Sequence, residues 1–400
     1  MRQLYITFIY KKSCPIFREK LMKKVGIIGA GISGLLIANL FKRNSNHQIT
    51  VFEKNHSIDL EEGYGIQLSI NSVKLLNEIG FDKFQNDKKF NPEKINFYSI
   101  KSSNKICNLN ISDFNSEDCK YTTLKRSDLV NFLKTGLENL IKTNHSISKI
   151  DQDSQKIKLT FENSETSECD CLIISDGVFS KSKNLISSYQ AKPRYNNTLA
   201  IRGMIPCSSE IDCKNISLFL GSDFHNVIYP INQNGDLNFI AIMKYNLSLN
   251  EQKKHSLFSD ENFIKKILDN VPLEIKKFLN EIKELKIFPV FVSKNYFKSK
   301  NNNIHFIGDA FFAFPPSFAQ GASQSIEGAY ELFKNIENNT EGDFFKSRMI
   351  KTKMVNNRSK FNQFAFHLSN PLTIFLRNIF LKRLVKNKKF LESYLGKIYR

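Results

Sequence analysis

The stretch Val25-Gly-Ile-Ile-Gly-Ala-Gly-Ile-Ser-Gly34 decides the fold of this chain. It begins as a short buried strand and continues beyond Gly34 into an apolar helix, Leu35–Phe41. Gly29 permits a tight turn, Gly31 lets the backbone approach a pyrophosphate, and Gly34 lets the helix pack close to the strand. The N-terminus of that helix would present free N–H groups and a positive dipole end to phosphates.

A carboxylate stands where such a site needs one. The next strand, Gln48-Ile-Thr-Val-Phe52, is followed directly by Glu53, about twenty positions after the last glycine of the fingerprint. An acid at this point accepts hydrogen bonds from the hydroxyls of an adenosine ribose. A glycine fingerprint between a strand and a helix, with the acid in place, predicts a dinucleotide site.

Length and composition bound the remaining possibilities. A chain of 400 residues favours two linked domains, and a hydrophobic content of 41% is enough for a sizeable core. The net charge of +19 would suit a nucleic-acid binder. Lys and Asn are abundant along the whole chain, however, and no nucleic-acid-binding motif accompanies the charge. We therefore expect no nucleic-acid partner.

The seven cysteines show neither paired CxxC spacing nor the density of a disulfide scaffold. Cys169-Asp-Cys171 places two thiols on one face of a strand, but no His or Cys at ligand spacing accompanies them. We therefore expect a reducing, cytosolic setting and no metal site.

Residues 1–21 stand apart from the predicted fold. Their apolar run, Tyr5-Ile-Thr-Phe-Ile-Tyr10, is too short to span a membrane, and no small-residue cleavage site follows it. Because Met22 stands directly before the first strand, we expect residues 1–21 to be a non-native or disordered extension.

Two kinds of predicted strand alternate along the rest of the chain. Short buried runs typical of a parallel sheet return at Cys171–Ile174 and Ile304–Ile307, whereas other stretches are β-rich. This pattern predicts a discontinuous dinucleotide domain formed by residues 22–92, 120–187 and 296–365. Residues 93–119 and 188–295 are expected to form a second, β-rich domain.

Three further motifs follow the glycine fingerprint. They are Gly65-Ile-Gln-Leu-Ser-Ile-Asn71, Asp176-Gly177 with Ser180, and Gly308-Asp-Ala310 with Pro315-Pro316 and Ala319-Gln-Gly-Ala322. Together, in this order, the four motifs resemble those of the single-component FAD-dependent aromatic hydroxylases with the para-hydroxybenzoate hydroxylase fold. The salicylate and 3-hydroxybenzoate hydroxylases are the most similar in character. The resemblance spans about residues 22–370.

The resemblance implies an α/β fold, with a Rossmann-like FAD-binding domain, an inserted mixed β-sheet substrate domain and a C-terminal helix. It implies FAD as cofactor and NADPH or NADH as co-substrate. Asp309 would accept hydrogen bonds from ribityl or ribose hydroxyls, and the helix at Gly321 would aim N–H groups at the flavin. Arg126 would reach the pyrophosphate, or it is a surface charge; Asp176 would touch the cofactor, or it caps a turn.

The full set of expected cofactor contacts combines these motifs. It comprises Gly29, Gly31, Ser33, Gly34, Glu53, Lys54, Gln67, Arg126, Asp176, Gly177, Gly308, Asp309, Pro316, Gly321 and Ala322.

In the implied reaction cycle, NAD(P)H reduces FAD and O₂ adds at flavin C4a. The hydroperoxide then transfers an oxygen atom to a phenolic or quinone-precursor ring. On the substrate side, Arg202 would pair with a carboxylate or brace the domain junction. His225 would deprotonate a phenol, or it is structural. Tyr229 lies four residues further along the same strand and therefore shares its face.

The C-terminal stretch 366–400 is expected to be one basic amphipathic helix. It would pack on the FAD-binding domain, or it would make a peripheral membrane contact. The second possibility would suit a lipophilic quinone-precursor substrate. We expect a cytoplasmic protein, either free or peripheral to the inner face of a membrane.

Two other functions stay open at this point. One is an FAD-dependent reductase or oxidase of the same superfamily, and the other is a non-catalytic FAD-binding protein. Flavin halogenases are excluded because their motif contains tryptophan, and this chain has none.

Overall fold

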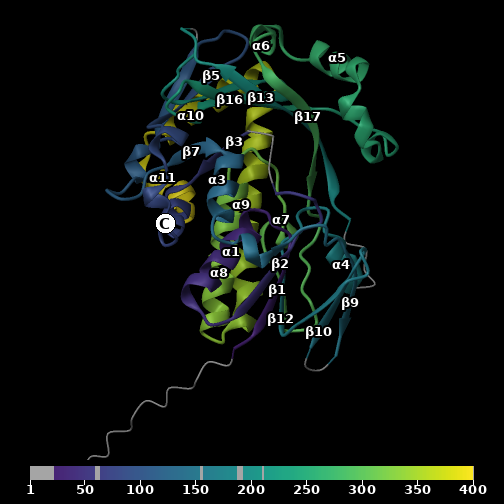
Figure 1. The fold of residues 1–400 in the computed structure, drawn as a ribbon. Helices are drawn as coiled ribbons and strands as arrows, with labels where there is room; N and C mark the ends of the chain where they lie inside the picture. Colours follow the sequence, from purple (N-terminus) through teal and green to yellow (C-terminus); the bar gives the residue numbers. More distant parts are fainter. Residues whose placement is uncertain (1–21, 59–63, 154–155, 187–191, 210, 400) are drawn as a thin grey trace, which may run out of the picture.

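The computed structural model describes residues 22–399 apart from 59–63, 154–155, 187–191 and 210 (Figure 1). The expectation for residues 1–21 lies outside the described residues. The structure has two lobes, with a parallel sheet and its helices in the lower one and a large mixed sheet in the upper one (Figure 1).

The lower lobe is built on a five-stranded parallel sheet drawn from distant parts of the chain. In spatial order its strands are β18 (Ile304–Phe306), β12 (Cys171–Ile174), β1 (Lys24–Ile28), β2 (Gln48–Phe52) and β8 (Ile141–Lys142). These strands are short and almost wholly apolar because both faces of a parallel sheet are covered. The carboxyl ends of β1, β2, β12 and β18 bring the glycine fingerprint, Glu53, Asp176 and Asp309 to one edge of the sheet.

Helices α1 (Ile32–Asn44) and α8 (Gly321–Glu337) pack against each other beside this sheet. Phe41 of α1 meets Phe333 of α8 edge to face, with ring centroids 5.3 Å apart. The contact thus joins the helix that follows the first motif to the helix that begins in the last motif.

The upper lobe contains a seven-stranded sheet. Its spatial order is β17 (Lys283–Val292), β13 (Arg194–Pro206), β16 (Asp236–Lys244), β15 (Phe224–Pro230), β14 (Ile216–Gly221), β5 (Lys94–Ser99) and β6 (Lys105–Asn110). Only β14 and β5 pair in parallel, so the sheet is mixed. Strands from both β-rich stretches of the sequence therefore belong to one sheet, and the predicted α/β fold with an inserted mixed sheet is confirmed.

Two smaller sheets complete the strand inventory. One contains β11 (Thr166–Cys169), β10 (Ile157–Phe161) and β9 (Ile147–Gln152); the other contains β3 (Gly65–Leu68), β7 (Thr122–Lys125) and β4 (Lys89–Phe90). The remaining helices before the C-terminal region are α2 (Ile70–Asn77), α3 (Arg126–Lys134), α4 (Lys181–Ile186), α5 (Glu261–Asp269), α6 (Leu273–Leu279) and α7 (Gly308–Phe311).

The C-terminal region differs from the single helix expected over 366–400. A long helix, α9 (Glu341–Phe366), is followed by α10 (Pro371–Leu384), α11 (Lys388–Leu391), a π-helical turn (Glu392–Gly396) and α12 (Lys397–Tyr399). The prediction of one helix is wrong because the span is interrupted twice: Asn370-Pro371 starts α10, and Asn387 caps the start of α11 after α10 has ended at Leu384. Asn370 Oδ1 accepts a hydrogen bond from the N–H of Leu372 at 2.9 Å, and Pro371 suits the first helical turn.

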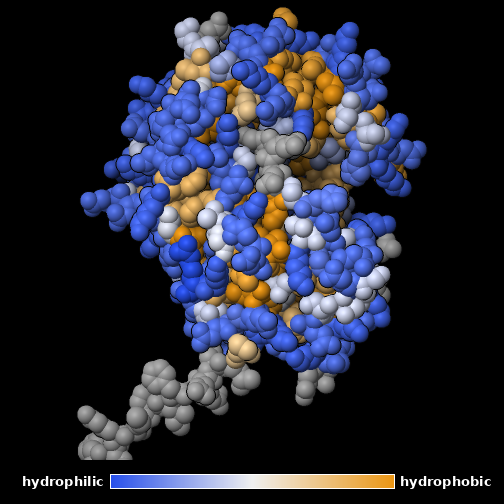
Figure 2. Space-filling model, viewed as in Figure 1, coloured by the Kyte–Doolittle hydropathy of each residue, from blue (hydrophilic) through white to orange (hydrophobic). Residues whose placement is uncertain are grey.

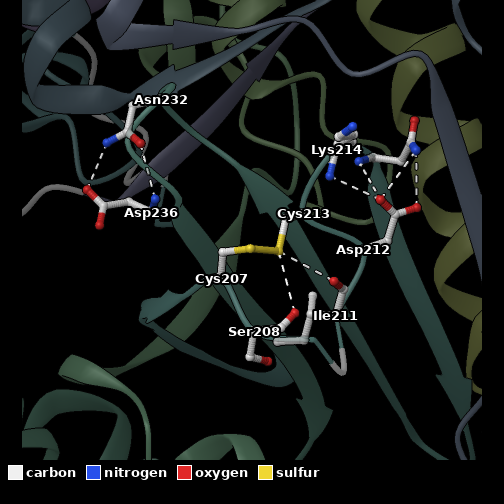
Figure 3. Close-up of a disulfide and its surroundings, with 9 residues drawn as sticks. Cys207, Ser208, Ile211, Asp212, Cys213, Lys214, Asn232 and Asp236 are labelled. Carbon is white, nitrogen blue, oxygen red and sulfur yellow. Dashed lines mark hydrogen bonds between the residues drawn. A yellow bond between two sulfur atoms is a disulfide. The ribbon is translucent and has the colours of Figure 1, made fainter.

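A disulfide joins Cys207 and Cys213, which the cysteine spacing did not predict (Figure 3). It closes the connection between β13 and β14. Asp212, within the loop, accepts a hydrogen bond at Oδ2 from Asn96 Nδ2 at 2.7 Å, which ties the loop to β5. The two cysteines are six positions apart, and the turn between β13 and β14 brings their side chains together.

No described helix is long and apolar enough to cross a membrane. Among the described residues, no group of three or more His, Cys, Asp or Glu side chains is arranged to hold a metal ion.

Candidate functional site

The glycine turn forms a cradle at the end of β1. Gly29 has φ +98°, and a Cβ there would lie 2.6 Å from the Ser175 carbonyl oxygen. A Cβ on Gly34 would collide with the Gly29 carbonyl and the Ser175 hydroxyl. At Gly31, by contrast, a Cβ would meet no atom of the described residues within 4 Å. Gly29 and Gly34 therefore close the turn, while Gly31 faces open space.

The first turn of α1 opens into the same space. No described side chain caps its N-terminus, and its first turn contains no acidic residue. Uncapped N–H groups and the helix dipole together suit an anion such as a pyrophosphate.

Glu53 braces the cradle from the end of β2. Its Oε2 accepts a hydrogen bond from the N–H of Ala30 at 2.9 Å, and its Oε1 accepts one from the N–H of Asn55 at 3.0 Å. The carboxylate is half-buried, whereas the neighbouring Lys54 is exposed. The acid is thus fixed beside the turn, as a ribose site requires.

The last motif is packed directly against the first. Gly308 has φ +60°, and a Cβ there would lie 2.5 Å from Ser33 Oγ in α1. Asp309 follows at the start of α7 and lines the central cavity. Its enclosed position raises the pKa of the Asp309 carboxyl, while Arg126 and Lys183 act in the opposite direction. Residues nearly three hundred positions apart thus meet at one site.

A buried cation, Lys183, lies just after the motif Asp176-Gly177 with Ser180. Burial lowers the pKa of Lys183, while Asp176 and Asp309 oppose that effect. Asp176 Oδ2 accepts hydrogen bonds from Ser182, at 2.8 Å from its hydroxyl and 3.2 Å from its N–H. The interpretation of Asp176 as a residue that caps the turn therefore has direct support. Its Oδ1 is buried and has no hydrogen-bond partner among the described residues.

A cavity of about 900 Å³ connects the two lobes. Its lower side is lined by Gln67, Asp309, Pro316, Gly321 and Ala322. Gly321 begins α8 as expected, and no described side chain caps that helix either. A Cβ on Gly321 would meet no described atom within 4 Å. This open, uncapped helix end has the free N–H groups and the space that the predicted flavin contact would need.

The upper side of the cavity carries the three substrate-side candidates. Arg202 lies on β13, and His225 and Tyr229 lie on β15; all three line the cavity. The predicted shared face of His225 and Tyr229 is therefore present. The guanidinium of Arg202 lies over the ring of Tyr64, 5.6 Å from its centroid, which also ties the lobes together.

His225 has a partner that the sequence did not reveal. Its Nδ1 lies 2.7 Å from Nε2 of His367, in the connection between α9 and α10. Burial lowers the pKa of His225 well below its usual value and that of His367 to about 4. The two imidazoles are thus a neutral, hydrogen-bonded pair at neutral pH.

A buried tyrosine network, also missed in the sequence, lies beside Gln67. The hydroxyl of Tyr121 donates to Gln67 Oε1 at 2.7 Å, and the ring centroids of Tyr121 and Tyr399 lie 6.0 Å apart. Burial raises the pKa of Tyr229, while Arg202 and Gln67 act in the opposite direction, and Tyr229 and Gln67 both line the cavity. Gln67 is therefore hydrogen-bonded to one buried phenol and influences the titration of a second.

Most of the remaining cavity wall is apolar. Figure 2 shows that hydrophilic residues cover the rim of this face, while apolar residues gather in its middle, between the lobes. The apolar residues that line the cavity come from the large sheet, the turn before α8, and helices α9 and α10. They include Phe97, Leu218, Val227, Ile240, Phe314, Phe318, Phe361, Leu376, Phe380 and Leu384.

Known proteins share both the sequence pattern and this architecture. Residues 22–349 match the family model described as "FAD binding domain". Salicylate hydroxylase from Pseudomonas putida is 23% identical over 352 residues, covering 78% of this chain and 77% of that protein. The 6-hydroxynicotinate 3-monooxygenase from Bordetella bronchiseptica is 21% identical, covering 78% and 82%.

Solved structures with the same fold include flavin hydroxylases. HpxO from Klebsiella pneumoniae, complexed with FAD and uric acid, superposes with a TM-score of 0.81 at 14% identity, covering 94% of this chain and 96% of that one. A salicylate hydroxylase substrate complex gives 0.74 at 17% identity, covering 95% and 97%. The chain therefore belongs to the FAD binding domain family and is an FAD-dependent monooxygenase similar to salicylate hydroxylase.

Proposed function

We propose that this enzyme hydroxylates a phenolic or quinone-precursor aromatic ring, using O₂ and either NADH or NADPH. The observation that carries the proposal is the single cavity. It joins the cofactor-side residues Asp309 and Gly321 to the substrate-side residues Arg202, His225 and Tyr229. The relatives named as hydroxylating salicylate and 6-hydroxynicotinate support the same substrate class.

The residues at the cradle fit FAD. Gly31 and the first turn of α1 would hold the pyrophosphate, Glu53 the adenosine ribose, and Asp309 the ribityl chain. Arg126 and Lys183 would supply positive charge beside Asp309. FAD supplies the redox and oxygen chemistry when bound; the protein binds, orients and excludes water.

His225 would be the base that deprotonates a phenolic substrate and so raises the electron density of its ring. In a neutral pair, one imidazole donates a hydrogen bond and the other accepts it. When Nδ1 of His225 donates to Nε2 of His367, Nε2 of His225 is left as an acceptor for a phenol proton. His367 would fix that tautomer and thus act as a positioning residue.

Arg202 would bind a second substituent of the substrate ring, apart from the hydroxyl that faces His225. It is half-buried and lies on the cavity wall. Its charge acts on Tyr229, where it opposes the rise in pKa that burial causes. A carboxylate or phenolate oxygen placed between these two residues would gain a charge-assisted hydrogen bond from the guanidinium.

Anaerobic reduction followed by oxygenation tests the proposal. The purified flavoprotein is mixed with NADH or NADPH, with and without phenolic acids, and flavin bleaching is followed by absorbance. O₂ is then admitted and the product is weighed by mass spectrometry. We expect one phenol to accelerate bleaching and to gain one oxygen atom.

Other outcomes would support the other functions. A product without added oxygen would indicate a reductase or oxidase. Flavin that neither nucleotide reduces would indicate a non-catalytic FAD-binding protein.

A further inference from the structure

Helices α9 and α10 leave large apolar side chains in contact with solvent. The exposed fractions are 58% for Phe361, 67% for Phe364, 66% for Leu372, 60% for Phe375 and 56% for Phe380. Leu376 is 42% exposed, and α10 as a whole contains no buried residue. We call these six side chains the α9–α10 patch. Contiguous exposed apolar residues of this size are typical of interaction sites.

The patch is also the rim of the cavity. Four of its members, Phe361, Phe364, Leu376 and Phe380, are exposed and at the same time line the cavity. Thr373, Arg377, Leu381 and Leu384 of α10 line it as well. The cavity behind the patch therefore opens at the surface where these apolar side chains gather.

Positive charge follows the apolar residues along the same helix face. Leu372, Phe375, Ile379, Lys382 and Arg383 follow one another at helical spacings of three or four residues (Ile379 to Lys382 or Arg383), so they share one side of α10. Lys386 follows just beyond the helix and is exposed. Lys388 and Lys389 come next and are exposed. Between residues 371 and 399, Glu392 is the only acidic residue, against seven Lys and Arg residues.

The basic residues beside the patch distinguish between two partners. In a symmetric contact between two copies of the chain, the α9–α10 patch of one copy would face the same patch of the other. That contact would bring the basic residues of both copies together, in a protein whose net charge is already +19. An anionic bilayer would instead accept the apolar side chains below its headgroups and the basic ones at its surface.

We propose that the α9–α10 patch docks on an anionic lipid bilayer, so that the mouth of the cavity opens against the membrane. The docking itself does not depend on the proposed function. Its consequence does: an aromatic substrate with an apolar extension would enter from the bilayer, and the extension would lie along the Phe- and Leu-rich wall at α10. This consequence rests on the hydroxylase function proposed above.

The absence of tryptophan gives a clean test of docking. In the variant Phe375→Trp, the introduced indole is the only one in the chain. We expect its emission to shift to shorter wavelength when phosphatidylglycerol-containing vesicles are added. Leu249→Trp, at a site 75% exposed and outside the patch, is the matched control and should not respond.

The basic residues are tested in the same background. Each Lys or Arg near an anionic surface contributes roughly fivefold to binding, so Lys382→Gln, Arg383→Gln and Lys386→Gln together should weaken it on the order of 100-fold. Lys254→Gln, Lys265→Gln and Lys266→Gln, which are exposed elsewhere, should leave vesicle binding nearly unchanged.

Three results would overturn the proposal. They are no shift with anionic vesicles, an equal shift with purely zwitterionic ones, and a shift that follows self-association in sedimentation experiments without lipid. None of these measurements needs turnover, so a failed hydroxylation assay would leave the docking result standing, and the reverse also holds.

Discussion

The imidazoles of His225 and His367 share a hydrogen bond of 2.7 Å, although 142 positions separate them in the sequence. His225 comes from the substrate sheet and His367 from the connection that leads into α10. The backbone N–H of Asp223 also donates to the His367 carbonyl at 3.2 Å. The C-terminal region is therefore attached to the strand that carries the candidate base.

Replacing His225 tests whether that base acts. We expect His225→Gln to lower kcat by roughly 10²- to 10⁴-fold, the usual contribution of a positioned acid or base. The flavin occupancy should not change, because His225 lies on the substrate side of the cavity. Stopped-flow turnover and flavin absorbance measure the two effects. Exposed His255 provides the control, as His255→Gln.

His367 should behave differently from His225. His367→Gln keeps a hydrogen-bonding side chain but no titrating ring, so a smaller loss of kcat and a shifted pH profile are expected. An unchanged pH profile in both variants would contradict the assignment of the base.

Asp309 should be required for the cofactor. The Asp309→Ala variant removes the carboxylate expected at the ribityl chain and leaves the positive charges of Arg126 and Lys183 without it. We expect the variant to fold, by circular dichroism, but to lose FAD on gel filtration. Exposed Asp269, changed to Ala, is the control. An Asp309→Ala protein with full flavin occupancy would show that the motif has another role.

Substitutions at two glycines of one turn should distinguish an effect on FAD binding from an effect on folding. Gly31→Ala adds a methyl group where no described atom lies within 4 Å, so the apoprotein should keep its stability while FAD affinity falls. Gly34→Ala drives the methyl group into the Gly29 carbonyl and should destabilise the apoprotein itself. Thermal unfolding and FAD titration distinguish these effects. Equal destabilisation by both changes would remove the argument for a phosphate cradle.

Local chemistry explains which parts of the site could be predicted from the sequence. Gly29, Glu53, Asp309 and Gly321 each stand at the end of a strand or the start of a helix, and such positions are visible in short patterns. The fold then brings them to one edge because parallel strands share their direction.

The residues that were missed depend on long-range packing. His367 and Tyr399 lie in the C-terminal region, and nothing near them in sequence indicates a contact with the cavity. The Cys207–Cys213 bond is local, with its cysteines six positions apart, but it depends on the turn that connects β13 and β14, which the spacing does not reveal. The stretch after Asp260 forms two helices, α5 and α6, because Pro272 cannot continue a helix from Val271.

Acid should destabilise the protein through its buried histidines. Burial lowers the pKa of His305, on β18, from 6.5 to about 4; Glu341 opposes this effect and Lys23 adds to it. Above pH 6.5 the ring is neutral in both the folded and unfolded states. Between pH 6.5 and about 4, only the unfolded chain takes up the proton, so the free energy of unfolding falls as pH falls.

For His305 alone, the loss should reach about 3 kcal/mol at pH 4. Denaturant titrations from pH 7 to 4 measure it as the difference between the wild-type protein and His305→Asn, which cannot titrate. The exposed His255→Asn variant should keep the wild-type slope. If His305→Asn kept that slope too, the acid sensitivity would have to come from other groups, with His225 and His367 the next to replace.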